Sequence, residues 1–590
     1  MAEQPASFRS FFARLGRLTR NDQILLSVLA VVIGAVTGVA AIGFRELIHL
    51  FQGLFFGADA GSLDQAIAAL AWWQVLLVPA LGGLLIGLFV RYWMPGGQPL
   101  GVAQVIESVA YHGGRMPLLS GLGAAFTSAA SIGVGASVGR EGPVVHLGAS
   151  LAACTVARLH LSRPLLLTVV ACGVASAIAA SFNAPIAGVF FALEVILGHY
   201  ALSAFAPIVL ASVTGTIVSR IYFGDFPAFV VPKYMLVSFL EFPAFALLGI
   251  LSGLVAILFM ASIFFVEGTW KRVPFPTWAR PAVGGLSVGA IALLFPQVLG
   301  VGYEATNAAL NESLPLALLL ALLVAKTATT ALSLGSGFGG GVFSPSLFLG
   351  AMLGGAFGMV AASVFPEYGS THGAYTIIGM GAVAGAVLGA PISTILIVFE
   401  LTGDYEITIA VMVATGIASV LVREAGVRSF FLQQLAGQGL KLDKGRAEGL
   451  LRNIAIQSVM RTDVPTVTAE ARVSEIRAKL AEAPNGEVYA VDREGCFLGV
   501  ITLRDLEDPA FDEDPVLKAT DLPTRHPILL EPGDGLEKAI TLLEGSDARS
   551  LPVVVDTASM RLVGALHEAD AVRAYNQALL NARAEEHGES

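Results

Sequence analysis

The stretch GVGASVGREGPVVHLGAS, residues 133–150, places an arginine and a glutamate, Arg140 and Glu141, inside a very apolar part of the chain. Charged side chains in a membrane interior cost about 2.5–3.5 kcal/mol each on insertion scales, so they mark candidate functional sites. Glycines flank the pair and Pro143 follows, which predicts an irregular backbone and then a new helix with Pro143 at its first position. The free N–H groups and the positive dipole end of such a helix attract an anion. The stretch predicts an anion site at a broken membrane helix; a glycine-rich packing segment with Arg140 paired to Glu141 is the alternative.

A second copy of this pattern favours the anion site. Residues 335–350, GSGFGGGVFSPSLFLG, contain a glycine run, then Phe343, which we expect to be exposed, and then Pro345 before an apolar helix. Each copy is followed by a short apolar segment, NAPIAGVFFALE at residues 183–194 and GAPISTILIVFE at residues 389–400, with a glutamate nine residues after the proline. This duplication predicts an internal repeat with its site at the interface between the halves.

These motifs resemble those of a known family. GREGP at residues 139–143 and GVFSP at residues 341–345 are similar to two of the three anion-coordinating loops of the CLC family of chloride channels and proton-coupled chloride transporters, and the resemblance spans about residues 25–435. It implies a polytopic α-helical membrane protein with an inverted internal repeat and broken re-entrant helices. It also implies a homodimer in contact with membrane lipid, in which each subunit has its own pore for chloride or a similar small anion.

Composition agrees with a membrane protein, because 55% of the residues are hydrophobic and only 14% are charged. Arginines precede the first apolar run, which favours a cytosolic N-terminus in the cytoplasmic membrane. The net charge of −10 comes mostly from the C-terminal part and argues against nucleic acid as a partner. The three cysteines are far apart, so no metal site is predicted, and no cofactor is required. Without a Walker loop, an HExxH motif or a catalytic triad, we do not expect an enzyme.

A change in composition near Leu440 predicts a soluble domain. Residues 487–506 and 550–572 both read as a short apolar strand, an Asp turn, a second strand and a helix start. This pattern resembles a tandem pair of CBS domains, a soluble α/β pair. The expected domains are a basic cytosolic segment at 1–21, the CLC-like transmembrane domain at 22–440 with halves of about 22–230 and 231–440, CBS domains at 455–515 and 516–577, and a C-terminal tail at 578–590.

Glu141 is the expected gate. A carboxylate beside an anion site competes with the anion for the same helix ends, and protonation removes this competition. In the CLC family the matching glutamate opens and closes the extracellular end of the pore. The resemblance also implies an anion site formed around Gly139, Arg140, Gly142, Gly341, Val342 and Phe343, in which backbone N–H groups bind the ion.

Two positions differ from the family pattern. The first loop of the family usually reads GSGIP, and the matching segment here, PLGVA at residues 99–103, puts Leu100 at the serine. Phe431 stands where a late tyrosine supplies a second hydroxyl. If both side-chain donors are lost, the sequence does not decide whether the site binds chloride tightly or which ion it prefers. A fluoride-selective pore is an alternative, and the intact GREGP motif argues against it.

A third difference concerns protons. Coupled exchangers of the family usually carry an internal glutamate just after the one matching Glu194, and this chain has Val195 there. Because valine cannot relay a proton, Val195 favours a Glu-gated chloride channel of the voltage-gated type with passive conduction. A proton-coupled chloride exchanger is the alternative, and Glu194 is either a structural carboxylate or another proton route.

The soluble part contains candidate nucleotide ligands. In GVITLRD, Thr502 and Asp505 match the CBS signature that holds the ribose of an adenine nucleotide such as ATP, ADP or AMP. The second copy has His567 in place of the threonine and keeps Asp570. Asp505 could instead cap its helix. A nucleotide-sensing protein with the membrane part as its effector is therefore a further alternative.

Overall fold

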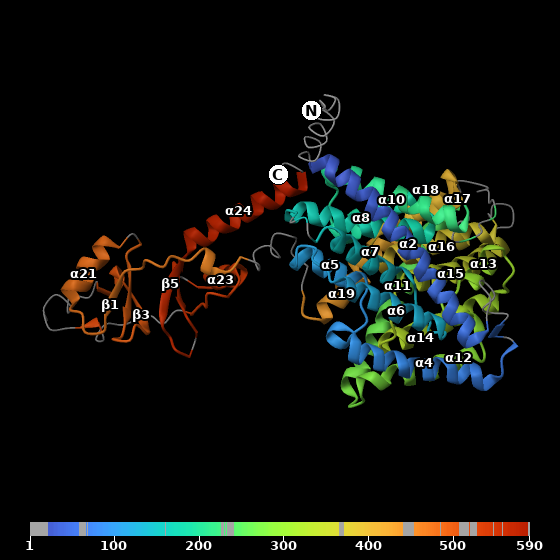
Figure 1. Cartoon of the computed structure of the whole chain (residues 1–590), viewed down its shortest axis with the longest axis horizontal. Helices are drawn as coiled ribbons and strands as arrows, with labels where there is room; N and C mark the ends of the chain where they lie inside the picture. The colour runs from blue at the N-terminus through green and yellow to red at the C-terminus, as the bar shows by residue number, and fades with distance from the viewer. Residues whose placement is uncertain are drawn as a thin grey trace, which may run out of the picture. The chain divides into compact units, whose positions relative to one another are not determined.

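The computed structural model describes residues 22–57, 66–157, 161–225, 241–364, 371–440, 454–506, 518–519 and 528–587, except 68, 484, 547 and 557, together with residues 159, 229 and 232. The expected segment at residues 1–21 lies outside this part. The chain divides into two compact units, Met1–Lys441 and Leu442–Ser590 (Figure 1).

The regular elements in the described residues of the first unit are all helices. Its elements in chain order are α2 (Asp22–Phe56), α4 (Trp72–Trp93), η1 (Pro95–Gly97), α5 (Val102–Tyr111), α6 (Leu118–Gly133), α7 (Glu141–Thr155), α8 (Arg163–Phe182), α9 (Pro185–Phe191), η2 (Ala192–Leu197), α10 (Leu202–Phe223), α11 (Phe242–Arg272), η4 (Thr277–Ala279), α12 (Arg280–Ala292), η5 (Pro296–Val298), α13 (Tyr303–Leu310), α14 (Leu316–Ser336), α15 (Phe343–Val364), α16 (His372–Leu388), α17 (Pro391–Thr402), α18 (Tyr405–Glu424) and α19 (Phe430–Gly437).

Eight of the described helices are long and apolar enough to cross a membrane: α2, α4, α8, α10, α11, α14, α15 and α18. Helix α17, with 12 residues, is about 18 Å long at about 1.5 Å per residue, which is less than a bilayer core of about 30 Å. Helix α9 continues into η2, a π-helical turn at Ala192–Leu197, and this segment is equally short. The short apolar segments at residues 183–194 and 389–400 therefore form short helices.

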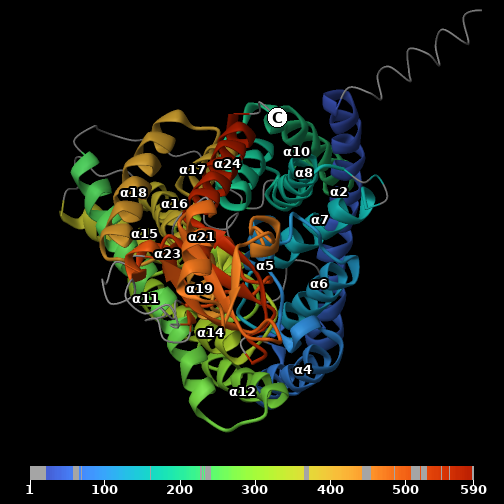
Figure 2. The same cartoon turned by 90° about the vertical axis from the view of Figure 1, so that its left-hand side faces the viewer.

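Two glycine pairs occupy corresponding places in the two halves of this unit. A Cβ atom on Gly148 or Gly173 would meet the carbonyl oxygen of the other at 2.5 or 2.2 Å, and a Cβ on Gly350 or Gly379 would do so at 2.3 Å. Helices α7 and α8 therefore approach backbone to backbone, and α15 and α16 do the same. The first half, blue to teal, and the second half, green to gold, lie side by side (Figure 2). The expected internal repeat is confirmed.

Two helices begin earlier than expected. Helix α7 starts at Glu141 and α15 at Phe343, so Pro143 and Pro345 are the third residues of their helices and not the first. Proline is tolerated throughout the first turn, because the N–H groups there have no intrahelical acceptor. Glu141 consequently belongs to the helix N-terminus itself.

The second unit contains two small sheets. In the first, β1 (Thr466–Thr468) is parallel to β2 (Glu487–Val491), and β2 is antiparallel to β3 (Phe497–Thr502); in the second, β4 (Ser550–Val554) is antiparallel to β5 (Leu562–His567). Both hairpins have a register shift near the end of their first strand, between Ala490 and Val491 and between Val553 and Val554. The other elements are η6 (Ile456–Ser458), α21 (Val473–Glu482), η7 (Leu503–Leu506), α23 (Leu536–Glu544) and α24 (Glu568–His587). Helix α24 continues through most of the expected tail at 578–590.

Candidate anion site

The two glycine-rich loops meet at Gly139 and Gly341. The Gly139 N–H donates to the Gly341 carbonyl at 2.7 Å, and the Gly341 N–H donates to the Gly139 carbonyl at 2.8 Å. A Cβ atom on Gly341 would come within 3.1 Å of the Gly142 nitrogen. This bridge brings the N-terminus of α7 and the N-terminus of α15 together, one from each half.

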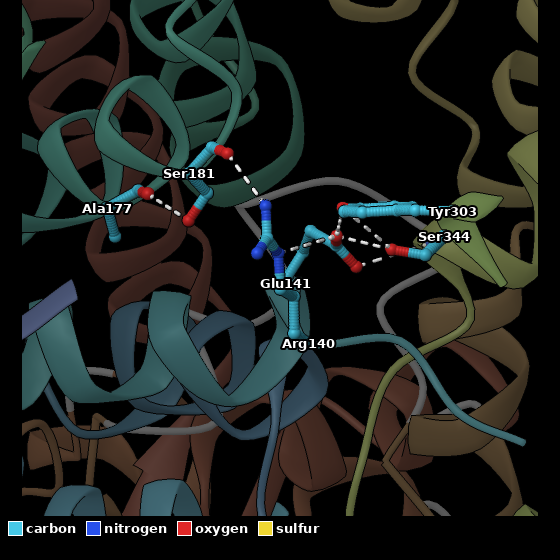
Figure 3. Close-up of polar contacts among 6 residues, drawn as sticks. All are labelled: Arg140, Glu141, Ala177, Ser181, Tyr303 and Ser344. Atoms are coloured by element: carbon cyan, nitrogen blue, oxygen red, sulfur yellow. Dashed lines mark hydrogen bonds and ion pairs between the residues drawn. The ribbon is translucent and has the colours of Figure 1, made fainter. Parts of the chain in front are cut away.

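Glu141 is buried where these helix ends meet, with 1% of its surface exposed. The Tyr303 hydroxyl donates a hydrogen bond to Oε1 at 3.0 Å, and the Ser344 N–H donates to Oε2 at 3.3 Å. The Ser344 hydroxyl also donates to Oε1 (Figure 3). A buried carboxylate is costly unless it is hydrogen-bonded, and these three donors stabilise its ionised form. We call this group of hydrogen bonds the Glu141 latch.

Tyr303 is held in place by the loop before α13. Lys326, fully buried in α14, donates from Nζ to the carbonyls of Val298 and Gly300 at 2.9 Å each. Gly302 then caps α13 with φ 89°, a left-handed conformation that glycine adopts readily. The ring of Tyr303 is therefore carried by a fixed backbone.

Arg140 and Glu141 have different hydrogen-bond partners. Its Nη2 donates to the Ser181 carbonyl at the end of α8 at 3.0 Å, whereas Glu141 turns toward Tyr303 and Ser344 (Figure 3). The nearest approach of the two side chains is 3.9 Å, from Arg140 Nε to Glu141 Oε1. The guanidinium lies over the Tyr303 ring, 4.8 Å from its centroid. The pair is in contact, but each side chain has its own stronger partners.

A large cavity of about 690 Å³ lies on one side of Glu141. Its wall contains five of the residues that the resemblance singles out, Leu100, Gly142, Gly341, Val342 and Phe431. Charged residues also line it, three of them basic and one acidic: Arg91, Lys271, Arg280 and Glu267. Gln434 of α19 and Gln438, the residue that follows this helix, add amide groups. The cavity thus joins the two helix N-termini to a wall with a positive balance of charge.

A smaller cavity of about 220 Å³ has Arg140 and Tyr303 in its wall. Gly142 lines the large cavity and Arg140 lines the small one, while Glu141, between them in the chain, lines neither. The chain therefore passes from one cavity to the other at the latched carboxylate.

The expectation that Phe343 is exposed is wrong. Only 3% of its surface is exposed, and its ring lies 5.0 Å from that of Phe182 and 6.2 Å from that of Phe191, measured between centroids. Aromatic residues from α8 and α9 of the first half cover it. The loop sequence could not show this, because the covering rings lie far away in the chain.

Glu194 and Glu400 cap helices in opposite halves. Glu194 accepts hydrogen bonds from the N–H groups of Ile392 and Ser393, at 3.1 and 2.8 Å, and from the Ser393 hydroxyl at 2.5 Å, at the start of α17. Glu400 accepts from the N–H groups of residues 186 and 187 at the start of α9, both at 2.8 Å. Val195 is half-buried in the π-helical turn and lines neither cavity.

Sequence analysis missed Tyr303 and two arginines of the small cavity, Arg45 and Arg220. Ser344 was contained in the GVFSP motif but received no role. A signal for Tyr303 exists, since LGVGYE at residues 299–304 is a glycine-rich interruption between apolar segments. Arg220 lies in the last turn of α10, where sequence alone suggests an interfacial anchor, whereas Arg45 lies well inside α2.

The candidate nucleotide ligands of the soluble unit contact other side chains of that unit. Asp505 Oδ2 accepts hydrogen bonds from the N–H and the hydroxyl of Thr502, at 2.8 and 2.6 Å. Asp570 accepts from Arg461 at 2.6 and 3.2 Å, and the His567 Nδ1 lies 2.8 Å from the Asn485 amide nitrogen. The arginine lowers the pKa of Asp570, and burial lowers the pKa of His567.

Comparison with known proteins agrees with this architecture. Residues 82–423 match the family described as "Voltage gated chloride channel". A relative from Ralstonia nicotianae, described as "Putative chloride channel protein ClcB-like", is 34% identical over 412 residues, which is 69% of this chain and 96% of the relative. The chain belongs to this family, the CLC family. Another CLC relative, the "Voltage-gated ClC-type chloride channel ClcB" of Escherichia coli O9:H4, is 30% identical over 69% of this chain and 98% of its own.

Solved structures show the same fold. A slow cyanobacterial Cl⁻/H⁺ antiporter aligns with a TM-score of 0.62 and 24% identity over 70% of this chain and 97% of its own. A eukaryotic CLC transporter aligns with a TM-score of 0.61 and 21% identity over 92% of this chain and 97% of its own. Residues 456–508 and 519–577 each match the CBS domain. The expected fold class is confirmed: a multi-pass CLC membrane protein followed by a CBS pair.

Proposed function

We propose that this protein transports chloride across a membrane by passive conduction, with Glu141 as the gate. The observation that carries the proposal is the latched Glu141 carboxylate between two cavities. Two features of the large cavity support an anion as its occupant: the helix N-termini at Gly142 and Val342, and the excess of basic residues in its wall.

In this mechanism, the ionised Glu141 closes the passage, because its carboxylate occupies the positive helix ends that an anion would otherwise use. Protonation removes the charge and weakens the hydrogen bonds from Tyr303 and Ser344. The side chain then leaves the passage, and an anion takes its place near the backbone N–H groups. Amides bind a weakly hydrated anion without trapping it, which permits rapid passage.

The residues at the place of the internal glutamate of coupled exchangers favour passive conduction. Val195 offers no ionisable group, and Glu194 is occupied by three donors at the start of α17. The relatives from Ralstonia nicotianae and Escherichia coli are also described as chloride channels.

The test is chloride efflux from liposomes that contain the purified full-length protein, with external pH recorded at the same time. Wild type should move chloride without stoichiometric proton movement, more rapidly at low pH. Glu141→Gln and Glu141→Ala should remove the pH dependence and conduct at all pH values. Tyr405→Phe changes an exposed residue of α18 and is the control for effects of purification and reconstitution. Failure of wild type to move chloride would disprove the proposal.

Proton-coupled chloride exchange is the second candidate. Two solved CLC structures of the same fold are described as proton antiporters, and Glu267 gives the large cavity a carboxylate. Proton movement driven by chloride efflux, abolished by Glu141→Gln, would establish exchange in place of conduction.

We further propose a homodimer in the cytoplasmic membrane, with the N-terminus and the CBS pair in the cytosol. The large cavity, lined by α19 just before the soluble unit, then faces the cytosol. For the CBS pair we propose a structural role that supports the dimer, because Thr502 and Asp505 bond to each other. Adenine nucleotide binding is the alternative, and titration of the full-length protein with ATP and AMP up to millimolar concentrations decides between them.

A further inference from the structure

Two serines occupy corresponding positions in the two halves of the repeat. Ser131, in α6, stands eight residues before Gly139, and Ser333, in α14, stands eight residues before Gly341. Gly139 and Gly341 are the glycines whose backbones bridge the two glycine-rich loops. Both serines are fully buried. The repeat thus places one hydroxyl at the same point of the chain ahead of each loop.

Each serine accepts a hydrogen bond from the loop of the other half. The Ser137 N–H donates to the Ser333 Oγ atom at 3.1 Å, and the Gly339 N–H donates to the Ser131 Oγ atom at 3.1 Å. Ser137 and Gly339 each lie two residues before the bridging glycine of their own loop. The two bonds are therefore reciprocal, as the glycine bridge is, and they connect α6 and α14 to the two loops.

The backbone of these loops is irregular, so its N–H groups have no acceptor within a helix. Ser137 and Gly339 are both buried. In a membrane protein such N–H groups need an acceptor that the protein itself supplies, and a buried N–H without one is costly. The two serine hydroxyls therefore hold the loops in one conformation.

The loop before Glu141 has further hydroxyl contacts. The Ser137 Oγ atom lies 3.1 Å from the Thr330 Oγ1 atom, and the Thr329 hydroxyl donates to the same Ser137 oxygen at 3.2 Å. Both threonines lie on α14 and are fully buried. Since Ser137 is four residues before Glu141, these contacts fix the backbone that carries the carboxylate of the latch.

The loop before Ser344 is fixed from α6. The Ser131 hydroxyl donates to the Thr127 carbonyl of its own helix at 2.7 Å, while its oxygen accepts from Gly339. Gly339 is five residues before Ser344, which donates to Glu141 through its N–H and its hydroxyl. The acceptor and one donor of the latch are thus each held by a serine of the opposite half.

We propose that Ser131 and Ser333 are positioning residues of the gate, each acting through the loop of the other half. The inference rests on the proposed function, because Glu141 is the group that they position. Ser333 holds the loop of the carboxylate, and Ser131 holds the loop of its donor Ser344. Neither serine lines a cavity, so the effect of each on chloride flux passes through the latch.

The test is chloride flux from liposomes at pH 7 for Ser131→Ala and Ser333→Ala, each made in wild type and in Glu141→Gln. In wild type each variant should raise flux by up to about tenfold, because a loop without its hydrogen bond releases the carboxylate more readily. In Glu141→Gln no ionised carboxylate is held, so flux should not change. Unchanged flux in wild type, or an equal change in both backgrounds, would overturn the proposal.

Two further variants separate positioning from a general loss of packing. Ser176 is also fully buried, and its hydroxyl joins α8 to the Gly34 carbonyl of α2 at 2.9 Å. Ser176→Ala should therefore leave flux unchanged in both backgrounds. Thr330→Val replaces a hydroxyl by a methyl group of similar size and should raise flux in wild type only. Equal flux changes in Ser176→Ala and Ser333→Ala would contradict the inference, as would unchanged flux in Thr330→Val.

Hydrogen exchange of the full-length protein in detergent gives a readout that requires no transport. Ser333→Ala should reduce protection in residues 134–142, and Ser131→Ala should reduce it in residues 337–344. Ser176→Ala should change neither segment. Protection that stays at the wild-type level in both segments would contradict the reciprocal bonds. If wild type moved no chloride, the proposed function would fail, and this crossed pattern would still decide whether the serines hold the loops.

Discussion

The hydroxyl of Tyr303 donates a hydrogen bond of 3.0 Å to the Oε1 atom of Glu141, so a residue of the second half holds a carboxylate of the first. The same tyrosine lines the small cavity, and the guanidinium of Arg140 lies over its ring. Ser344 completes the latch through its hydroxyl and its N–H. The position of Glu141 is therefore determined by both halves of the repeat.

Removing one hydroxyl should loosen the latch. In Tyr303→Phe or Ser344→Ala, the ionised carboxylate loses a donor worth about 1.5 kcal/mol. The carboxylate then leaves the helix ends more readily, and chloride flux at a fixed pH should rise by up to about tenfold. Flux from liposomes at pH 7 measures this increase. Tyr405→Phe should keep the wild-type flux, and unchanged flux in both latch variants would exclude a role for these hydroxyls.

Restoring the hydroxyls missing from the large cavity should tighten anion binding. Leu100 and Phe431 line this cavity together with Val342. Phe431→Tyr or Leu100→Ser would place a donor there, and one hydrogen bond to an ion should lower the chloride dissociation constant about tenfold. Calorimetric titration of the purified protein gives this constant. Phe265→Tyr, at a position 72% exposed, is the matched control; equal effects at Phe265 and Phe431 would contradict the prediction.

Glu194 and Glu400 should behave alike if both are helix caps. Glu194→Gln and Glu400→Gln each weaken a cap at the start of the other half's short helix, and each should lower the free energy of unfolding by about 1 kcal/mol. Thermal unfolding in detergent, followed by tryptophan fluorescence, measures the loss. Neither variant should change proton movement in the liposome assay. Proton movement in wild type that only Glu194→Gln abolishes would identify Glu194 as a proton carrier.

Much of the architecture could be predicted because it rests on local chemistry. Glycines and prolines around Arg140 and Glu141 identify the broken helices, since charges in apolar surroundings need a functional reason. The second copy at residues 335–350 identifies the repeat. The prolines placed the starts of α7 and α15 two residues too late, because proline is compatible with any place in the first turn.

The rest depends on contacts between distant segments. Phe343 is buried because rings from α8 and α9 cover it. Tyr303 reaches Glu141 only because Lys326 fixes the loop before α13. Arg45, Arg140 and Arg220 line one cavity because the middle of α2 and the C-terminal ends of α8 and α10 come together there. None of these pairs is close in sequence, so no local pattern indicates them.

His567 should make the stability of the soluble unit depend on pH. Burial, and then the charge of Arg461, lower the pKa of His567 in the folded state. The unfolded chain binds a proton near pH 6.5, whereas the folded unit does not, so stability should fall as the pH drops below about 6.5. The slope for one proton is at most about 1.4 kcal/mol per pH unit. Hydrogen-exchange protection of β5 in the full-length protein, compared at pH 7.5 and 5.5, measures this loss.

Two control variants separate the titration of His567, near neutral pH, from that of Asp570, in acid. His567→Gln should remove the loss of protection between pH 7.5 and 5.5, because no group at that position then titrates. The pKa of Asp570 is lowered by Arg461, so its contribution is present above about pH 4 and is lost only as the pH falls through the folded value. Asp570→Asn should therefore reduce protection at pH 7.5 as well as at pH 5.5. A pH dependence that persists in His567→Gln would show that another group of the soluble unit takes up the proton.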